Sequence, residues 1–119
     1  MTDAVPADPD ADLRWMRGAI GLAAEGAVVG EVPVGTVVVR GDVELGRGRN
    51  GRIAASDATA HAEMVAIGAA CAAAGNYRLS CATLYSTLEP CVMCAGAIVH
   101  ARSAASMSGV CIFLPLGFR

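Results

Sequence analysis

The chain contains no lysine, and all nine of its basic residues are arginine. Every basic contact therefore depends on the planar, forked guanidinium group. No apolar run approaches the ~18 residues that a membrane helix needs. The N-terminus is acidic and carries Pro6 and Pro9, whereas a secretory signal is basic and then apolar. These absences argue against a membrane or exported protein, and we expect a cytoplasmic one.

Aromatic residues are also scarce, at 4% of the chain, although 55% of its residues are hydrophobic. The difference is made up largely by 24 alanines, so the core is expected to consist of small side chains. A length of 119 residues is sufficient for one such core but not for two.

The chain also lacks an excess of positive charge, since its net charge is −2. Four acidic residues precede residue 13, and the remainder of the chain has nine arginines against seven acids, or +2. This balance permits an RNA partner without requiring one. We interpret residues 1–11 as a disordered acidic leader.

The residue pattern predicts a helix over 12–27, where Leu13, Met16 and Ile20 recur at helical spacing. A hairpin of strands 32–39 and 43–48 follows, with its turn at Gly41-Asp42. After a loop over 49–60, a helix over 61–74 is expected, capped by Asp57 or Thr59. A strand over 82–87, a helix from Pro90 to about 102 and a strand over 110–114 complete the order. This order predicts an α/β sandwich around a mixed sheet.

Two short segments carry the chemistry: His61-Ala62-Glu63 and Pro90-Cys91-Val92-Met93-Cys94, each at the start of a predicted helix. Cysteines three residues apart lie on one helix face and can share one metal ion, with His61 as a third ligand. Glu63 points away from His61 and lies beside the fourth, open position, where it can move protons. The pattern predicts a catalytic zinc site.

Other interpretations of these cysteines remain. Cys91 and Cys94 could form a redox pair, although such a pair does not need His-x-Glu on another helix. A structural zinc site would need a fourth ligand, for which Cys71, Cys81 and Cys111 are candidates; we interpret these three as buried or tail thiols. His100 lies near the end of its helix and is not expected to bind metal.

The segment 46–51 matches the G-x-G-x-x-G pattern of dinucleotide sites, but no helix is predicted to start there, so we reject that interpretation. Arg47, Arg49 and Arg52 cluster in the same region. A solvated face is the simplest interpretation of this cluster, and a phosphate-contacting face is the alternative.

The combination of H-x-E and P-C-x-x-C is the signature of zinc-dependent nucleobase deaminases. Over residues 13–102, the sequence resembles the bacterial tRNA-specific adenosine deaminases in the cytidine/deoxycytidylate deaminase superfamily. The resemblance rests on four segments: Glu31–Gly35, Asp57–Glu63, Asn76–Leu79 and Ala82–Ala97. It implies a cytidine deaminase-like α/β/α sandwich.

The resemblance also implies an activity, namely conversion of adenosine to inosine at the wobble position of a tRNA anticodon loop. His61, Cys91 and Cys94 would hold one Zn²⁺ per subunit, hydroxide generated there would attack C6, and Glu63 would shuttle the proton. Asn50 would contact the target nucleoside, and the protein would be a homodimer.

The sequence departs from the family pattern in two places. Ala58 stands where proline is usual, and the match stops after Arg102. We therefore expect an incomplete deaminase domain over 12–102, with the C-terminal elements missing, and an atypical tail over 103–119. A frameshift or a premature stop is the hypothesis for this tail, and a coding sequence in which no frame restores the family's continuation would refute it.

Two other functions fit the same residues. The first is deamination of a free base or nucleoside of the guanine or cytosine type, which needs the same catalytic centre with another pocket. The second is a zinc-binding but inactive domain.

Overall fold

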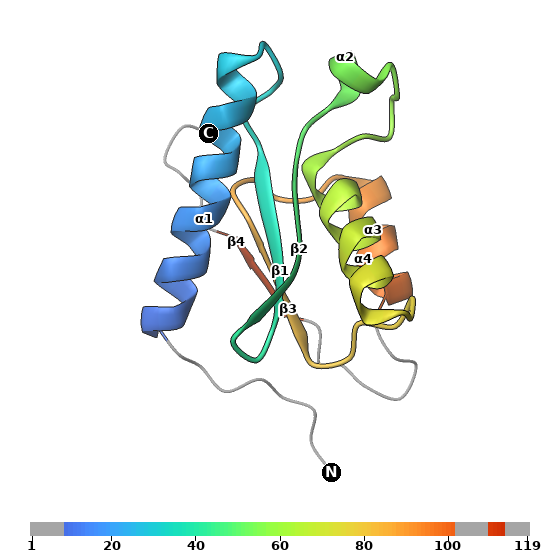
Figure 1. Ribbon diagram of the computed structural model, residues 1–119. Helices are drawn as coiled ribbons and strands as arrows, with labels where there is room; N and C mark the ends of the chain where they lie inside the picture. Colours follow the sequence, from blue (N-terminus) through green and yellow to red (C-terminus); the bar gives the residue numbers. More distant parts are fainter. Residues whose placement is uncertain (1–8, 102–109, 114–119) are drawn as a thin grey trace.

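The computed structural model of the protein describes residues 9–101 and 110–113, with side chains over 9–101. Figure 1 shows the arrangement of the elements. In chain order they are α1 (Pro9–Val28), β1 (Gly35–Arg40), β2 (Val43–Arg49), α2 (Arg52–Ala55), α3 (Ala62–Ala74), β3 (Ala82–Ser86), α4 (Val92–Ala101) and β4 (Val110–Phe113). The order inferred from the sequence is confirmed, and the structure adds α2.

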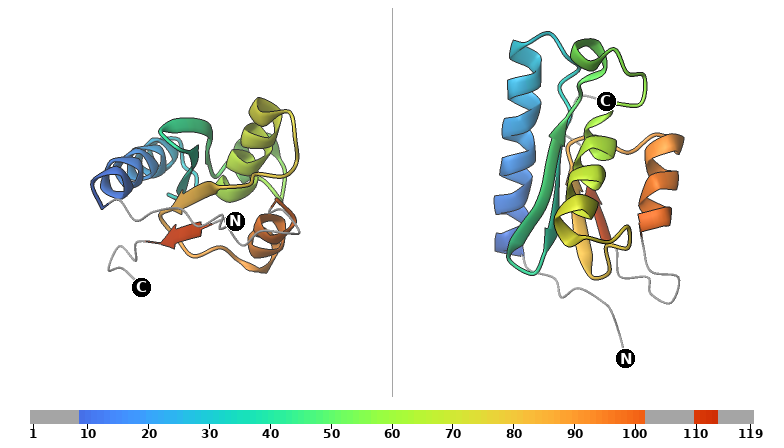
Figure 2. Two further views of the ribbon diagram at one scale, coloured as in Figure 1. Left: turned by 90° about the horizontal axis from the view of Figure 1, so that it is seen from below. Right: turned by 45° about the vertical axis from the view of Figure 1, so that its right-hand side comes forward.

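The strands form one mixed sheet in the order β2-β1-β3-β4. β1 runs antiparallel to both β2 and β3, and β4 runs parallel to β3. Helix α1 covers one face of the sheet, while α3 and α4 lie on the other (Figures 1 and 2). The predicted α/β/α sandwich around a mixed sheet is therefore confirmed.

Two apolar clusters form the core because side chains alternate along β1. Val38 packs with Ala66, Ala70 and Leu84 on the side of α3. Val37 and Val39 pack with the residues of α1 on the other face. Strand β1 thus contacts the helices on both faces of the sheet, and five of its six residues are buried.

Helix α3 packs very closely on strand β2. A Cβ atom added at Gly48 would lie 2.6 Å from the carbonyl oxygen of Ala62, and one at Gly46 would lie 2.5 Å from that of Ala66. Ala62, Ala66 and Ala70 are fully buried along this contact. The first two glycines of the G-x-G-x-x-G segment therefore serve helix–strand packing, which needs no dinucleotide.

Helix α1 begins at Pro9, so the predicted leader over 1–11 is wrong for residues 9–11; residues 1–8 lie outside the described part. Proline suits the first turn of a helix, and Asp10 and Asp12 there complement the helix dipole. The buried face includes Met16 and Ala19, whereas Leu13 and Ile20, whose helical spacing contributed to the prediction, are exposed. Helix α1 packs directly on β1 at Gly35, where an added Cβ atom would overlap the carbonyl oxygen of Ala19.

Several element boundaries in the structure differ from those predicted from the sequence. The first strand starts at Gly35 instead of residue 32, because Val34 N–H bonds back to Val32 in a turn next to Pro33. The predicted loop over 49–60 contains α2. Of the predicted tail over 103–119, only β4 is described, at the predicted position; the domain boundary at 102 stays a prediction. None of the helices in the described ranges is long and apolar enough to cross a membrane.

We predict that Gly48→Ala destabilises the protein by about 1–3 kcal/mol, the usual range for overpacking a tight contact. The control is Gly68→Ala on α3, where an added Cβ meets nothing within 4 Å. That substitution should be neutral or stabilise by up to about 1 kcal/mol. Urea unfolding of both variants measures the difference. Equal stability of the two would mean that α3 does not need the β2 glycines.

Candidate metal centre and adjoining cavity

Three side chains from two helix starts converge into one potential metal-ligand cluster. The Nδ1 atom of His61 lies 3.6 Å from the sulfur of Cys91 and 3.6 Å from that of Cys94. The two sulfurs are 3.7 Å apart. The residues predicted from the sequence as ligands are thus brought together, and they form the one such cluster found in the described residues.

These distances fit a tetrahedral zinc ion. Zinc binds sulfur at about 2.3 Å and imidazole nitrogen at about 2.0–2.1 Å, so a tetrahedron sets its ligands about 3.8 Å (S to S) and about 3.6 Å (S to N) apart. The observed S–S separation of 3.7 Å and S–N separations of 3.6 Å agree with these two values. Two thiols and one imidazole are also a donor set that zinc prefers, and three ligands leave its fourth position open.

Each ligand is held by backbone contacts at the start of a helix. His61 is the N-cap residue of α3 in an extended conformation. The segment before Cys91 is tied to β1, because Gly35 N–H donates to Thr87 Oγ1 at 3.1 Å and Thr87 N–H donates to the Gly35 carbonyl. The segment that leads to the two cysteines is therefore fixed to the central strand of the sheet.

The two thiols differ electrostatically. A hydrogen bond from the backbone N–H of Cys94 lowers the pKa of the exposed Cys91 thiol. Burial, together with the negative charge of Glu63, raises the pKa of the Cys94 thiol to about 12. Cys94 is therefore protonated near neutral pH until a cation displaces its proton.

Glu63 lies beside the cluster without joining it. Its side chain is 4% exposed in the first turn of α3, and its charge acts on both thiols. With His61 and Cys91 it lines a cavity of about 150 Å³. This volume is well below the ~300 Å³ at the lower end of drug-sized pockets, so the cavity suits a small group such as one heterocyclic base.

The side chain of Asn50 lines the same cavity and also caps α3. Its Oδ1 atom accepts the N–H of Ala62 at 2.8 Å, and the residue is 5% exposed. The prediction that Asp57 or Thr59 caps this helix is wrong. The Asp57 carboxylate instead accepts the N–H and hydroxyl of Thr59 in a local turn.

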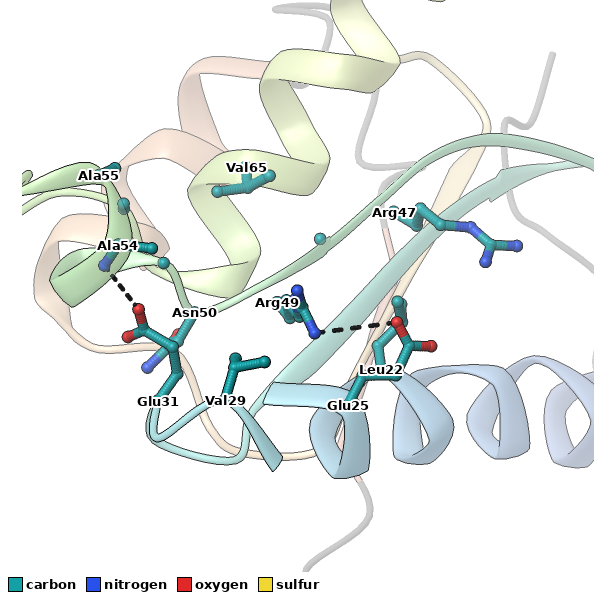
Figure 3. Close-up of a pocket in the computed structure, with 13 residues that line it drawn as sticks. Leu22, Glu25, Val29, Glu31, Arg47, Arg49, Asn50, Ala54, Ala55 and Val65 are labelled. Carbon is teal, nitrogen blue, oxygen red and sulfur yellow. Dashed lines mark hydrogen bonds and ion pairs between the residues drawn. The ribbon is translucent and has the colours of Figure 1, made fainter. Parts of the chain in front are cut away.

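Sequence reasoning missed one functional candidate, Glu31. Its buried carboxylate accepts the N–H groups of Ile53 at 3.3 Å and Ala54 at 2.9 Å, and so holds α2. A larger cavity of about 560 Å³ lies between α1, β2 and α2, with Glu31 and Asn50 in its wall (Figure 3). No local pattern signals Glu31, because its partners lie more than twenty positions away along the chain.

The alternative ligands lie elsewhere. Cys71 is half-buried next to the Tyr77 carbonyl, and Cys81 is exposed. Neither belongs to the cluster, nor does the exposed His100. The side chain of Cys111 lies outside the described residues. The described part of the chain therefore offers zinc three ligands instead of a closed set of four.

An open three-ligand metal site with a buried carboxylate beside it, set on an α/β/α sandwich, defines a metal-dependent hydrolytic class. The sequence profile of the cytidine and deoxycytidylate deaminase zinc-binding region matches residues 9–109. The chain belongs to this deaminase family, and zinc is its cofactor.

Within the family, the chain is 48% identical over 93 residues to a tRNA-specific adenosine deaminase of Buchnera aphidicola, covering 78% of this chain and 57% of that protein. It is 46% identical over 101 residues to a protein of the same name from Haemophilus influenzae, covering 84% and 58%. The chain thus spans less than two thirds of the length of these curated relatives.

Two solved structures are also similar. One comes from a study of adenosine-to-inosine editing by tRNA deaminases at the wobble position; it has 43% identity and a TM-score of 0.73, and the match covers 76% of this chain and 65% of that one. The other is a guanine deaminase from Bacillus subtilis, with 37% identity, a TM-score of 0.76 and coverage of 85% and 62%.

Removal of one sulfur ligand should remove the metal. We expect Cys94→Ala to lower zinc affinity by more than about 100-fold. Substitution of residues that only hydrogen-bond to a ligand typically lowers metal affinity by about 10–100-fold, and loss of the ligand itself should cost more. Cys71→Ala is the matched control and should keep zinc at one ion per chain. Metal analysis of the purified proteins measures both. Full zinc content in Cys94→Ala would refute the site.

Zinc binding should also release protons. Because the pKa of Cys94 is about 12 without metal, its thiol is fully protonated at pH 7 and must lose that proton to become a ligand. We therefore expect release of at least one proton per zinc ion and an apparent affinity that rises with pH. Calorimetry in buffers with different protonation enthalpies counts these protons. A heat independent of the buffer would contradict the prediction.

Proposed function

We propose that the protein hydrolyses adenosine to inosine at the wobble position of a tRNA anticodon loop. The observation that carries this proposal is the convergence of His61, Cys91 and Cys94 beside the buried Glu63, in a cavity of a base's dimensions. The identities of 42–48% to tRNA-specific adenosine deaminases support adenosine in tRNA as the substrate. In the reaction, water adds to C6 and the C6–N6 bond breaks, so the products are inosine and ammonia.

The residues of the site have separate roles in this reaction. His61, Cys91 and Cys94 would hold zinc, which when bound makes water a competent nucleophile near neutral pH. Glu63 takes a proton from the water and gives a proton to the leaving amine. Its burial at the start of α3 keeps the carboxylate in the cavity, and the N-terminal end of that helix favours its negative charge.

Asn50 orients the base. The N–H of Ala62 can only donate, so it holds the oxygen of the Asn50 amide and leaves the NH₂ group as the free end. Asn50 then offers a donor to the cavity and selects a base with an acceptor near the reacting carbon. The ring nitrogens of adenine meet this requirement.

Guanine deamination is the second candidate function. It is favoured by the structural similarity to the Bacillus subtilis guanine deaminase. A free base would need only the small cavity, whereas a tRNA would also need contacts with the protein around the rim of that cavity. Activity of the zinc-loaded protein on guanine but not on RNA would favour this candidate over the first.

We further propose that the chain is a cytoplasmic homodimer, since tRNA is found in the cytoplasm and the family resemblance implies paired subunits. The α4 side chains of Val92 and Val99 lie seven residues apart along one side of the helix and are 91% and 61% exposed, and they offer apolar surface for a second copy. Sedimentation equilibrium tests this assembly, and a monomer mass would refute it.

We predict that Glu63→Gln lowers inosine formation on an anticodon stem-loop by at least about 100-fold, the lower end of general acid–base contributions. Zinc content should stay at one per chain because Glu63 is not a ligand. The control, Glu25→Gln, makes the same change on an exposed side chain outside the catalytic cavity and should retain activity. A zinc-loaded natural chain that forms no inosine would refute the proposed function.

A further inference from the structure

The three clustered arginines have different surroundings. Arg47 forms two hydrogen bonds with the carboxylate of Glu44, at 2.8 and 2.9 Å. Arg49 lies 3.9 Å from Glu25 at the wall of the larger cavity (Figure 3). Arg52 forms no ion pair with any other described residue, and its side chain is exposed. Within the described ranges, one cation of the cluster is thus left without an ion-pair partner.

Arg52 also occupies a particular place: it lines the catalytic cavity with His61 and Glu63. It is the only arginine among the described residues of the cavity wall, and the acidic side chains there are Glu63 and Glu89. Glu63 is a buried carboxylate, and its negative charge opposes an anionic substrate in the cavity. Arg52 is the described arginine of the cavity wall that can offset this charge.

The backbone position of Arg52 is fixed by hydrogen bonds around α2. It is the first residue of α2, which the carboxylate of Glu31 holds through Ile53 and Ala54. Asp57 N–H closes the segment by donating to the Arg52 carbonyl at 3.1 Å. Because Glu31 already occupies these N–H groups of α2, the guanidinium of Arg52 is the group left to bind an anion.

We propose that Arg52 binds a phosphate group of the target nucleotide when its base enters the catalytic cavity. A guanidinium presents several N–H donors in a plane and matches the oxygens of a phosphate. This contact would distinguish a nucleotide within RNA from a free base or nucleoside, which has no phosphate. The inference rests on the proposed function and deepens it by assigning the substrate's backbone contact.

The test compares Arg52→Gln with Arg17→Gln, which changes the net charge equally on the exposed face of α1. Binding of an anticodon stem-loop is measured by fluorescence anisotropy in zinc-loaded Glu63→Gln protein over a range of salt concentrations. Arg52→Gln should weaken binding about tenfold at low salt, the scale of one charge-assisted contact. The slope of log K against log salt should fall by about 0.7, the value for one phosphate on single-stranded RNA. Arg17→Gln should change neither.

Turnover supplies the second measurement. In the active protein, Arg52→Gln should raise KM for the stem-loop about tenfold with a much smaller change in kcat. Arg52→Lys should restore most of the salt slope because it keeps the charge. An unchanged slope and KM in Arg52→Gln, or a loss confined to kcat, would overturn the role of Arg52 while the proposed function stands. A natural chain that binds RNA through Arg52 but forms no inosine would refute the function alone, and absence of RNA binding would refute both.

Discussion

The contact between the glycines of β2 and the alanines of α3 is the constraint on which the site depends. Gly46 and Gly48 have no side chains, so the helix backbone lies directly on the strand. This contact brings the start of α3, with His61 and Glu63, to the end of β2, where Asn50 follows immediately. A larger residue at either glycine would push away the helix that carries a metal ligand and the carboxylate.

Close packing also explains the composition. A core rich in alanine gains little hydrophobic free energy per residue, but it lets helices approach a sheet closely. The same principle acts on the other face, where Gly35 receives α1 at Ala19. Each contact is linked to one part of the metal cluster. The α3 contact positions the helix that starts after His61, and Gly35 also forms hydrogen bonds with Thr87 ahead of Cys91. Packing and site geometry therefore share the same residues.

Buried polar side chains in this fold tend to serve two elements at once. Asn50 completes the start of α3 and faces the cavity, and Glu31 lies beside α1 and holds α2. Such bonds keep the cavity wall in place without a large apolar core. They also connect the cavity wall to stability, since neither Asn50 nor Glu31 can be changed without affecting the start of a helix.

The sequence by itself determined the order of elements and pointed to the residues of the metal cluster. His61, Glu63, Cys91 and Cys94 were candidates because helical spacing and ligand chemistry are local properties. Other features required the tertiary structure: the cap supplied by Asn50, the hold of Glu31 on α2, and the face of α1 that is buried, which leaves Leu13 and Ile20 exposed. The separation of Arg52 from Arg47 and Arg49 also appears only in the structure. Each of these depends on contacts between side chains, or with backbone groups, brought together by folding, and no periodicity in the sequence encodes which distant partner a side chain meets.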